Sequence, residues 1–191
     1  IMWLWSKVET AQRNGAVTIT KNQVPTPAAA EAFYFRAMLG GWLSCKKPEP
    51  HPTLEGWEWY KYTEETEHGT LIFIDEWGEG HEGPGGSIRI YFLPKDALPQ
   101  DTILLWVMVY RGAYSGEVLK ALQDVLKATY KKCVFNAGRG CVKGKIPNHP
   151  GLFYHNTPTS EAFQGFTTTE TIYDDDGHKR GGHAVSGGWC F

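Results

Sequence analysis

Two glutamates have similar surroundings in the sequence and could do acid and base chemistry together. Glu76 lies in the segment GTLIFIDEWGEG, which begins at Gly69, and Glu170 lies in GFTTTETIYDDDG, which begins at Gly165. Paired carboxylates can divide the roles of general acid and general base between them. The two segments therefore predict a hydrolase or isomerase as one candidate function. The simpler interpretation, which we prefer, is that each glutamate pairs with a backbone group or an arginine nearby.

A second group of residues could bind a small molecule. Aromatic side chains mainly fill cores, but beside carboxylates and guanidinium groups they can also line a cleft for a small polar ligand. The predicted ligand-binding residues are Trp57, Trp59, Trp77, Tyr91, Tyr110, Arg111 and Arg139. Because the sequence has many aromatics and glycine-rich loops but no specific catalytic motif, binding or sensing of a small polar ligand is the function that it favours.

Two further patterns could suggest a metal or a nucleotide. His178 and His183 lie close to the acidic residues 174–176, but the HxH or HExxH spacing of common metal sites is absent. The glycines between Gly78 and Gly85 match a phosphate-binding spacing, but Pro84 and a predicted strand stand where a helix would have to begin. We therefore expect neither a metal nor another cofactor.

The composition limits the choice of partner and compartment. The 191 residues carry a formal net charge of -2, so a general affinity for nucleic acid or for an anionic membrane is not expected. The four cysteines lack CxxC spacing, which favours reduced thiols and a cytoplasmic location, although a Cys133 to Cys141 bridge and a leader removed before Ile1 stay open. A protein partner could contact the terminal GGWCF and the loop 133–150. The oligomeric state is undetermined.

The elements that must position these residues are organised around residues 102–131. The pattern predicts a strand over 103–110 with two apolar faces, typical of a central strand covered on both sides, and then a helix after Ser115. Thr26 and Pro27 predict the start of another helix, over 27–39. Strands are expected at 16–20, 70–77 and 87–93, with a loop of about nine residues between the last two.

These elements predict one α+β domain over residues 1–191. We expect a single, mostly antiparallel and twisted sheet of roughly six to eight strands with two main helices packed on it. The similar glutamate segments further indicate two half-repeats, 28–114 and 115–191, with Glu76 and Glu170 in equivalent positions beside the central strand.

The order of short motifs resembles DUF5680, a bacterial family of domains of unknown function. The similarity covers residues 28 to 191 and rests on the list Trp106, Met108, Tyr110, Gly112, Arg139, Gly140, Phe166, Glu170, Ile172, Gly177, Gly187 and Gly188. Two positions depart from the family pattern: the segment TLIFIDEW lacks an internal glycine, and Ser186 replaces an aromatic residue. The resemblance implies a shared fold and no particular chemistry.

Overall fold

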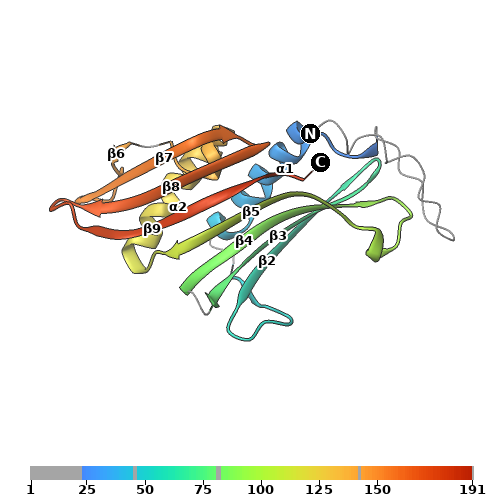
Figure 1. Ribbon diagram of the computed structural model, residues 1–191, viewed down its shortest axis with the longest axis horizontal. Helices are drawn as coiled ribbons and strands as arrows, with labels where there is room; N and C mark the ends of the chain where they lie inside the picture. The colour runs from blue at the N-terminus through green and yellow to red at the C-terminus, as the bar shows by residue number, and fades with distance from the viewer. Residues whose placement is uncertain (1–22, 45–46, 81–82, 142, 191) are drawn as a thin grey trace.

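The computed structural model describes residues 23–44, 47–80, 83–141 and 143–190 (Figure 1). These residues form one antiparallel sheet of nine strands, which does not close on itself, and two α-helices. The predicted α+β class with a single antiparallel sheet is confirmed. The strand expected at 16–20 lies outside the described residues.

The elements have the following bounds. The helices are α1 (Pro27–Gly40) and α2 (Gly116–Tyr130), with short 3-10 turns at Trp42–Ser44, Pro99–Asp101 and Asn136–Gly138. The strands are β1 (Glu49–Pro50), β2 (Glu58–Thr66), β3 (Gly69–Gly80), β4 (Gly83–Pro94), β5 (Ile103–Ala113), β6 (Gly144–Lys145), β7 (Leu152–Ala162), β8 (Gly165–Asp174) and β9 (Lys179–Trp189). Their order across the sheet is β1-β2-β3-β4-β5-β9-β8-β7-β6.

The chain repeats one pattern, a helix followed by an antiparallel meander. The helix α1 precedes β1 to β5, and α2 precedes β6 to β9. The two meanders join where β5 pairs with β9, and Val107 lies opposite Gly188 in that pairing. Counting outward from this junction, β4 corresponds to β8 and β3 to β7. The strand that carries Glu76, β3, thus corresponds to β7, whereas Glu170 lies on β8. The two glutamates are therefore not in equivalent positions.

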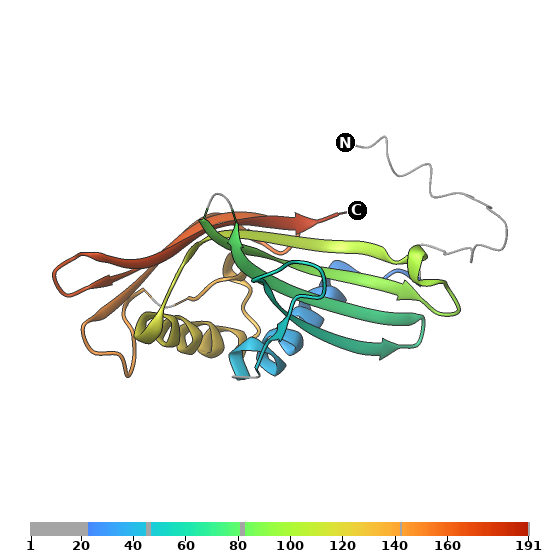
Figure 2. The ribbon, with the colours of Figure 1, turned by 90° about the horizontal axis from the view of Figure 1, so that it is seen from below.

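Both helices cover the same face of the sheet, which curves over them (Figure 2). We call this the inner face. On β5 the inner side chains Trp106 and Met108 are fully buried, whereas the outward Val109 is 48% exposed. The strand is central, as predicted, but the expectation that both of its faces are covered is wrong. The prediction failed because several apolar residues lie half-buried on the outer face, among longer polar neighbours.

The two predicted helices are present. The Thr26 hydroxyl accepts a hydrogen bond from the Ala29 amide at 3.3 Å, and the φ angle of Pro27 suits the first turn. In α2 the stripe that faces the sheet is buried, at Val118, Leu122, Val125, Leu126 and Thr129. None of the helices in the described residues is long and apolar enough to cross a membrane.

Most of the glycine-rich segment that was predicted as a loop is strand, because residues 78–80 belong to β3 and residues 83–86 to β4. Gly78 pairs with Gly85, and Trp77 pairs with Gly86, so the hairpin continues well beyond the predicted strand ends. The sequence suggested a loop because glycine usually weakens strands. Here the glycines leave room for aromatic rings, as described below.

Candidate functional site

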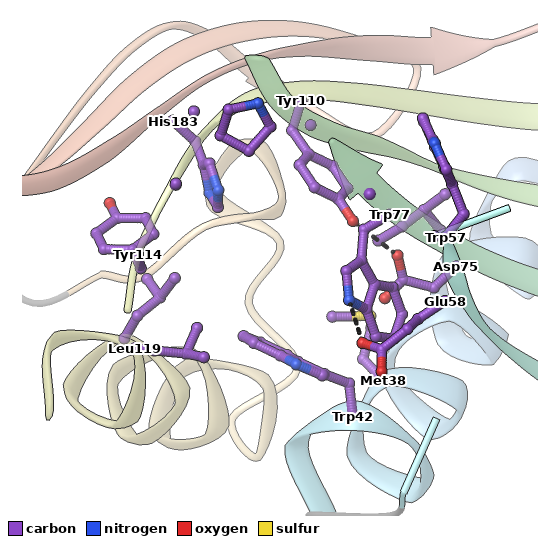
Figure 3. Close-up of a pocket in the computed structure, with 18 of the residues that line it drawn as sticks. Met38, Trp42, Trp57, Glu58, Asp75, Trp77, Tyr110, Tyr114, Leu119 and His183 are labelled. Atoms are coloured by element: carbon purple, nitrogen blue, oxygen red, sulfur yellow. Dashed lines mark hydrogen bonds between the residues drawn. The ribbon is translucent and has the colours of Figure 1, made fainter. Parts of the chain in front are cut away.

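A pocket of about 610 Å³ lies between the inner face of the sheet and the two helices. Figure 3 shows its side chains converging from the sheet, from α2 and from the end of α1. Most of them are apolar or aromatic, and the list comprises Met38, Trp42, Trp57, Trp77, Ile88, Tyr110, Tyr114, Leu119 and Leu122. The acidic and basic side chains in the lining are Glu58, Asp75, Arg139 and His183. Size and lining are those of a typical small-molecule site.

Glycines on neighbouring strands make space for the aromatic walls. A Cβ atom at Gly86 would lie 2.5 Å from the Tyr110 hydroxyl oxygen, and one at Gly78 would lie 2.5 Å from Cγ of Trp57. On the other side of the pocket, a Cβ at Gly181 would lie 2.5 Å from the Tyr114 ring. Each of these aromatic side chains therefore lies directly against backbone that carries no side chain. The glycine pattern, visible in the sequence, was the missed signal for these positions.

Asp75 is the inward carboxylate of β3. Its side chain is 5% exposed, and Tyr110 donates a hydrogen bond from its hydroxyl to Asp75 Oδ1 at 3.1 Å. Burial raises the pKa of Asp75 to about 7, because an apolar pocket disfavours the charged form more than the Tyr110 hydrogen bond and the Arg139 charge favour it. A carboxyl group in this pocket can thus gain or lose a proton near neutral pH.

Arg139 also lines the pocket and is 5% exposed. Its guanidinium carbon is 5.7 Å from the centroid of the Tyr110 ring, and its Nη1 nitrogen is 3.6 Å from Glu170 Oε1. Arg139 Nε is buried and has no hydrogen-bond partner among the described residues. A buried N–H in a native protein normally has an acceptor, which an ordered water or a bound group can supply when the chain does not.

A strained turn places Arg139 in the interior. Asn136, Ala137 and Gly138 all have positive φ angles, of 43°, 55° and 67°. Two of these residues have side chains that disfavour this conformation, which costs free energy and must be held by contacts. Tyr130 donates its hydroxyl hydrogen to the Gly138 carbonyl at 2.5 Å, and the Asn136 side-chain amide donates to the Gly140 carbonyl at 2.6 Å. From the sequence, the loop 133–150 was a possible contact surface for a protein partner, but Arg139 within it is buried.

Glu170 balances the buried charge of Arg139. Its side chain is fully buried, accepts a hydrogen bond from the Tyr154 hydroxyl at 2.7 Å, and lies 3.0 Å from Nδ1 of His183. Burial by itself would raise the pKa of Glu170, but Arg139 and His183 outweigh it, and the pKa is lowered. Burial and the nearby Arg139 lower the pKa of His183. The lasting charges of this wall are therefore one guanidinium and one carboxylate.

Glu76 and Glu170 do not face a common pocket. Glu76 follows Asp75 on β3, so its side chain points to the outer face, whereas Glu170 points to the inner face with its register partner His183. The paired-carboxylate arrangement that the sequence suggested is thus absent. Adjacent side chains on a strand point to opposite faces, and the sequence alone does not say which face is covered. The prediction therefore chose Glu76, whereas the inward carboxylate of this pair is Asp75.

On the outer face, Glu76 holds a cluster together. Its carboxylate accepts hydrogen bonds from Ser87, at 3.0 Å, and from Arg89, and it lies 3.3 Å from Nε2 of His51. Nδ1 of His51 accepts hydrogen bonds from the amides of Thr53 and Leu54, at 3.2 and 3.0 Å. Glu76 therefore fixes the segment 51–57, whose last residue, Trp57, reaches the pocket.

The structure divides the predicted ligand-binding residues between the two faces. Four line the pocket: Trp57, Trp77, Tyr110 and Arg139. Three lie elsewhere, because alternation along their strands turns them outward: Trp59 beside His51, Tyr91 beside Arg89, and Arg111 next to the inward Tyr110. Sequence reasoning missed Asp75, Tyr114 and His183, and it also missed Leu119 and Leu122 because their helical stripe is typical of ordinary core packing.

The acidic turn is a separate feature from the pocket. Ligand atoms of Asp174, Asp176 and His178 lie within 4.8 Å of one another, but Asp174 Oδ1 already accepts hydrogen bonds from the amides of Asp176 and His178. Gly177 has a φ angle of 80°, as a tight turn requires. These contacts explain the turn, and His183 lies apart from it on the inner face.

No family model, no curated protein and no solved structure matches this chain. The resemblance to DUF5680 therefore stays a prediction.

Proposed function

We propose that the protein binds or senses a small molecule in the pocket between the sheet and the helices. The observation that carries this proposal is Arg139, a buried guanidinium on the pocket wall whose Nε lacks an acceptor among the described residues. Aromatic walls favour a flat, largely apolar ligand body, and the polar side chains favour a polar group at its edge.

The contacts of Arg139 support a ligand-binding site more than a purely structural arginine. A structural arginine in an interior is normally satisfied by several hydrogen bonds, because an unsatisfied donor there costs on the order of 1–3 kcal/mol. Within the part of the chain that the structure describes, the Arg139 guanidinium has one ion pair, to Glu170, and one ring contact, to Tyr110. A ligand with a hydrogen-bond acceptor would relieve the deficit and convert it into binding free energy.

A thermal-shift screen of nucleotides, sugars, amino acids and flat heterocycles tests the proposal. A ligand at about 100 times its Kd should stabilise the protein by about 2.7 kcal/mol. Leu119→Trp fills the pocket and should abolish the shift, whereas Val109→Trp on the outer face, which is 48% exposed, should leave it unchanged. If no class stabilises the protein, or if Leu119→Trp responds as the unchanged protein does, the pocket is not a binding site.

A role in protein contact, the other alternative from the sequence, has less support. That alternative needs an exposed Trp189 at the end of β9, but Trp189 is only partly exposed and packs against the core. We therefore favour ligand binding over protein contact through this segment.

We also infer a cytoplasmic location from the cysteines. Cys133 and Cys190 are exposed free thiols, and the Cys133 to Cys141 bridge that the spacing left open is not formed. Exposed free thiols persist in a reducing compartment. Labelling of Cys133 by a thiol reagent in intact cell extract prepared without reductant would support this, and an oxidised Cys133 would contradict it.

A further inference from the structure

His183 and Glu170 form a hydrogen-bonded pair at the wall of the pocket. Nδ1 of His183 lies 3.0 Å from Glu170 Oε1, and the two residues are register partners on β9 and β8. The Glu170 side chain is fully buried, whereas 12% of the His183 side chain is exposed. His183 also lines the pocket, and Figure 3 shows its ring on the pocket wall. The imidazole is therefore the member of the pair that a molecule in the pocket can contact.

Glu170 determines which ring nitrogen of His183 carries the proton. Burial raises the pKa of Glu170, but Arg139 and His183 lower it further, so Glu170 is a carboxylate at neutral pH. A carboxylate only accepts hydrogen bonds, so Nδ1 of His183 must be the donor. Burial lowers the pKa of His183 below its ordinary value. At pH 7 the ring is therefore neutral, and its Nε2 holds an unshared electron pair.

Nε2 of His183 is open to the pocket. It makes no hydrogen bond to any described residue, and it is not one of the buried nitrogen and oxygen atoms that lack a partner in that part of the chain. The atom is therefore accessible, and the space beside it is the pocket that His183 lines. The rings of Tyr110 and Tyr114 contact the imidazole at centroid distances of 5.3 and 4.7 Å. These contacts and the hydrogen bond to Glu170 fix the direction of a base.

The rest of the lining limits the chemistry that such a base can do. Among the described residues that line the pocket there is no serine, threonine, cysteine or lysine. A base beside one of these would activate a nucleophile, so that common use of a histidine is absent from this pocket. The remaining use is direct removal of a proton from the bound molecule. Rings such as those of Trp42 and Trp77 favour a flat molecule.

From this geometry we propose that the pocket catalyses a proton transfer, in which Nε2 of His183 removes a proton from carbon in a flat, neutral substrate. The inference rests on the proposed function, because the substrate must first bind in the pocket, and it adds a chemical step. Glu170 is the positioning residue, since it orients the imidazole and stabilises the imidazolium that forms. In an isomerisation the same nitrogen returns the proton at another atom of the substrate, so the step needs no further reactant.

Elimination of 5-nitrobenzisoxazole tests the reaction, because it needs one base and no other reactant. The base takes the proton of the isoxazole C–H, the C–H electron pair forms a nitrile, and the N–O bond breaks with its pair on oxygen. The product is a coloured nitrophenolate. We expect the protein at pH 7 to be at least about 100-fold faster than an equal concentration of imidazole. Leu119→Trp should abolish this rate and thereby place the reaction in the pocket.

His183→Asn separates the base from the fold. The Asn amide nitrogen stands near the position of Nδ1 and can still donate to Glu170, but the side chain has no base. We expect the elimination to fall to the rate of the solution without protein, with the melting temperature little changed. His155→Asn makes the same substitution at an exposed position on β7 and should keep the full rate.

Nitrogen-15 NMR of the imidazole rings tests the role of Glu170 without any substrate. We expect His183 at pH 7 to be neutral with its proton on Nδ1, and the signals that disappear in His183→Asn assign the ring. A proton on Nε2, or an imidazolium at this pH, would overturn the proposal whatever the rate of elimination.

The outcomes separate the proton transfer from the binding function. Elimination no faster than that with imidazole, or an equal rate in His183→Asn, overturns the proton transfer and leaves the binding function standing. A loss of rate in Asp75→Asn without one in His183→Asn would make Asp75 the base and likewise overturn it. Failure of the binding function has a different result, which is that no ligand class stabilises the protein in the thermal-shift screen.

Discussion

The ring of Tyr110 lies across Gly86, its nearest partner on β4, so closely that a Cβ at Gly86 would be 2.5 Å from the Tyr110 hydroxyl oxygen. That hydroxyl donates to Asp75 on the strand beyond. The glycine therefore allows the tyrosine to reach across β4, and it connects the sheet backbone with the polar edge of the pocket.

Gly86→Ala should displace Tyr110 and damage both the fold and the pocket. The new methyl group would meet the Tyr110 hydroxyl and the backbone carbonyl of Glu76, so we expect a loss of roughly 1–3 kcal/mol in unfolding free energy. Gly165→Ala is the matched control, because a Cβ there has no atom within 4 Å, and it should change stability by less than about 0.5 kcal/mol. Urea unfolding measures both, and equal effects would contradict the proposed role of Gly86.

Gly78→Ala should affect the pocket more than the stability. The closest atoms to the new Cβ belong to the Trp57 ring, which stands on a loop and can move away. We expect Trp57 to leave the pocket wall, with a change in Trp fluorescence and a weaker response to any ligand found in the screen. A crystal structure with Trp57 in place and an unchanged Kd would show that Gly78 has no such role.

The sequence predicted the fold class, both helices and the central place of β5, because cap residues and hydrophobic periodicity report local structure directly. It predicted the site only in part. Trp57, Trp77, Tyr110 and Arg139 line the pocket, but the choice between Asp75 and Glu76 depends on which face of β3 is covered. That choice is made by α1 and α2 packing on one side of the sheet, a tertiary arrangement that alternation along a single strand cannot reveal.

Replacing the two glutamates should give very different losses of stability. Glu170→Gln would leave the buried Arg139 without its counter-ion, at a cost of about 3–5 kcal/mol. Glu76→Gln keeps hydrogen-bonding capacity toward Ser87 and His51, and its partner Arg89 is 35% exposed, so we expect about 1 kcal/mol. Thermal denaturation at pH 7 measures the pair. Similar losses would mean that Arg139 is satisfied without Glu170.

Tyr130→Phe should loosen the turn that holds Arg139. The lost hydroxyl leaves the Gly138 carbonyl without its donor and also removes the contact to the Tyr34 hydroxyl at 2.9 Å. We expect a loss of about 1–2 kcal/mol in stability and a weaker affinity for any pocket ligand. Thr129→Val on the same helix is a useful comparison, because its hydroxyl accepts from Cys141 and does not touch residues 136–138. It should lower stability but leave the relative affinities of ligands unchanged.

The ionisation of Asp75 should make the protein less stable as the pH rises toward neutrality. The pKa of Asp75 is raised by burial to about 7 in the folded protein, from an ordinary value of 3.8. Between pH 3.8 and about 7, the folded protein keeps a proton on Asp75 that the unfolded chain has already released. The contribution of this carboxyl to the free energy of unfolding is therefore complete below pH 3.8 and is lost as the pH rises through about 7. Asp75→Asn should stabilise the protein on the order of 2 kcal/mol at pH 8 and very little at pH 4. Urea unfolding at the two pH values, with Asp176→Asn as control, measures the difference. An equal effect of Asp75→Asn at both would show that Asp75 is ionised throughout the range, with Arg139 compensating its burial.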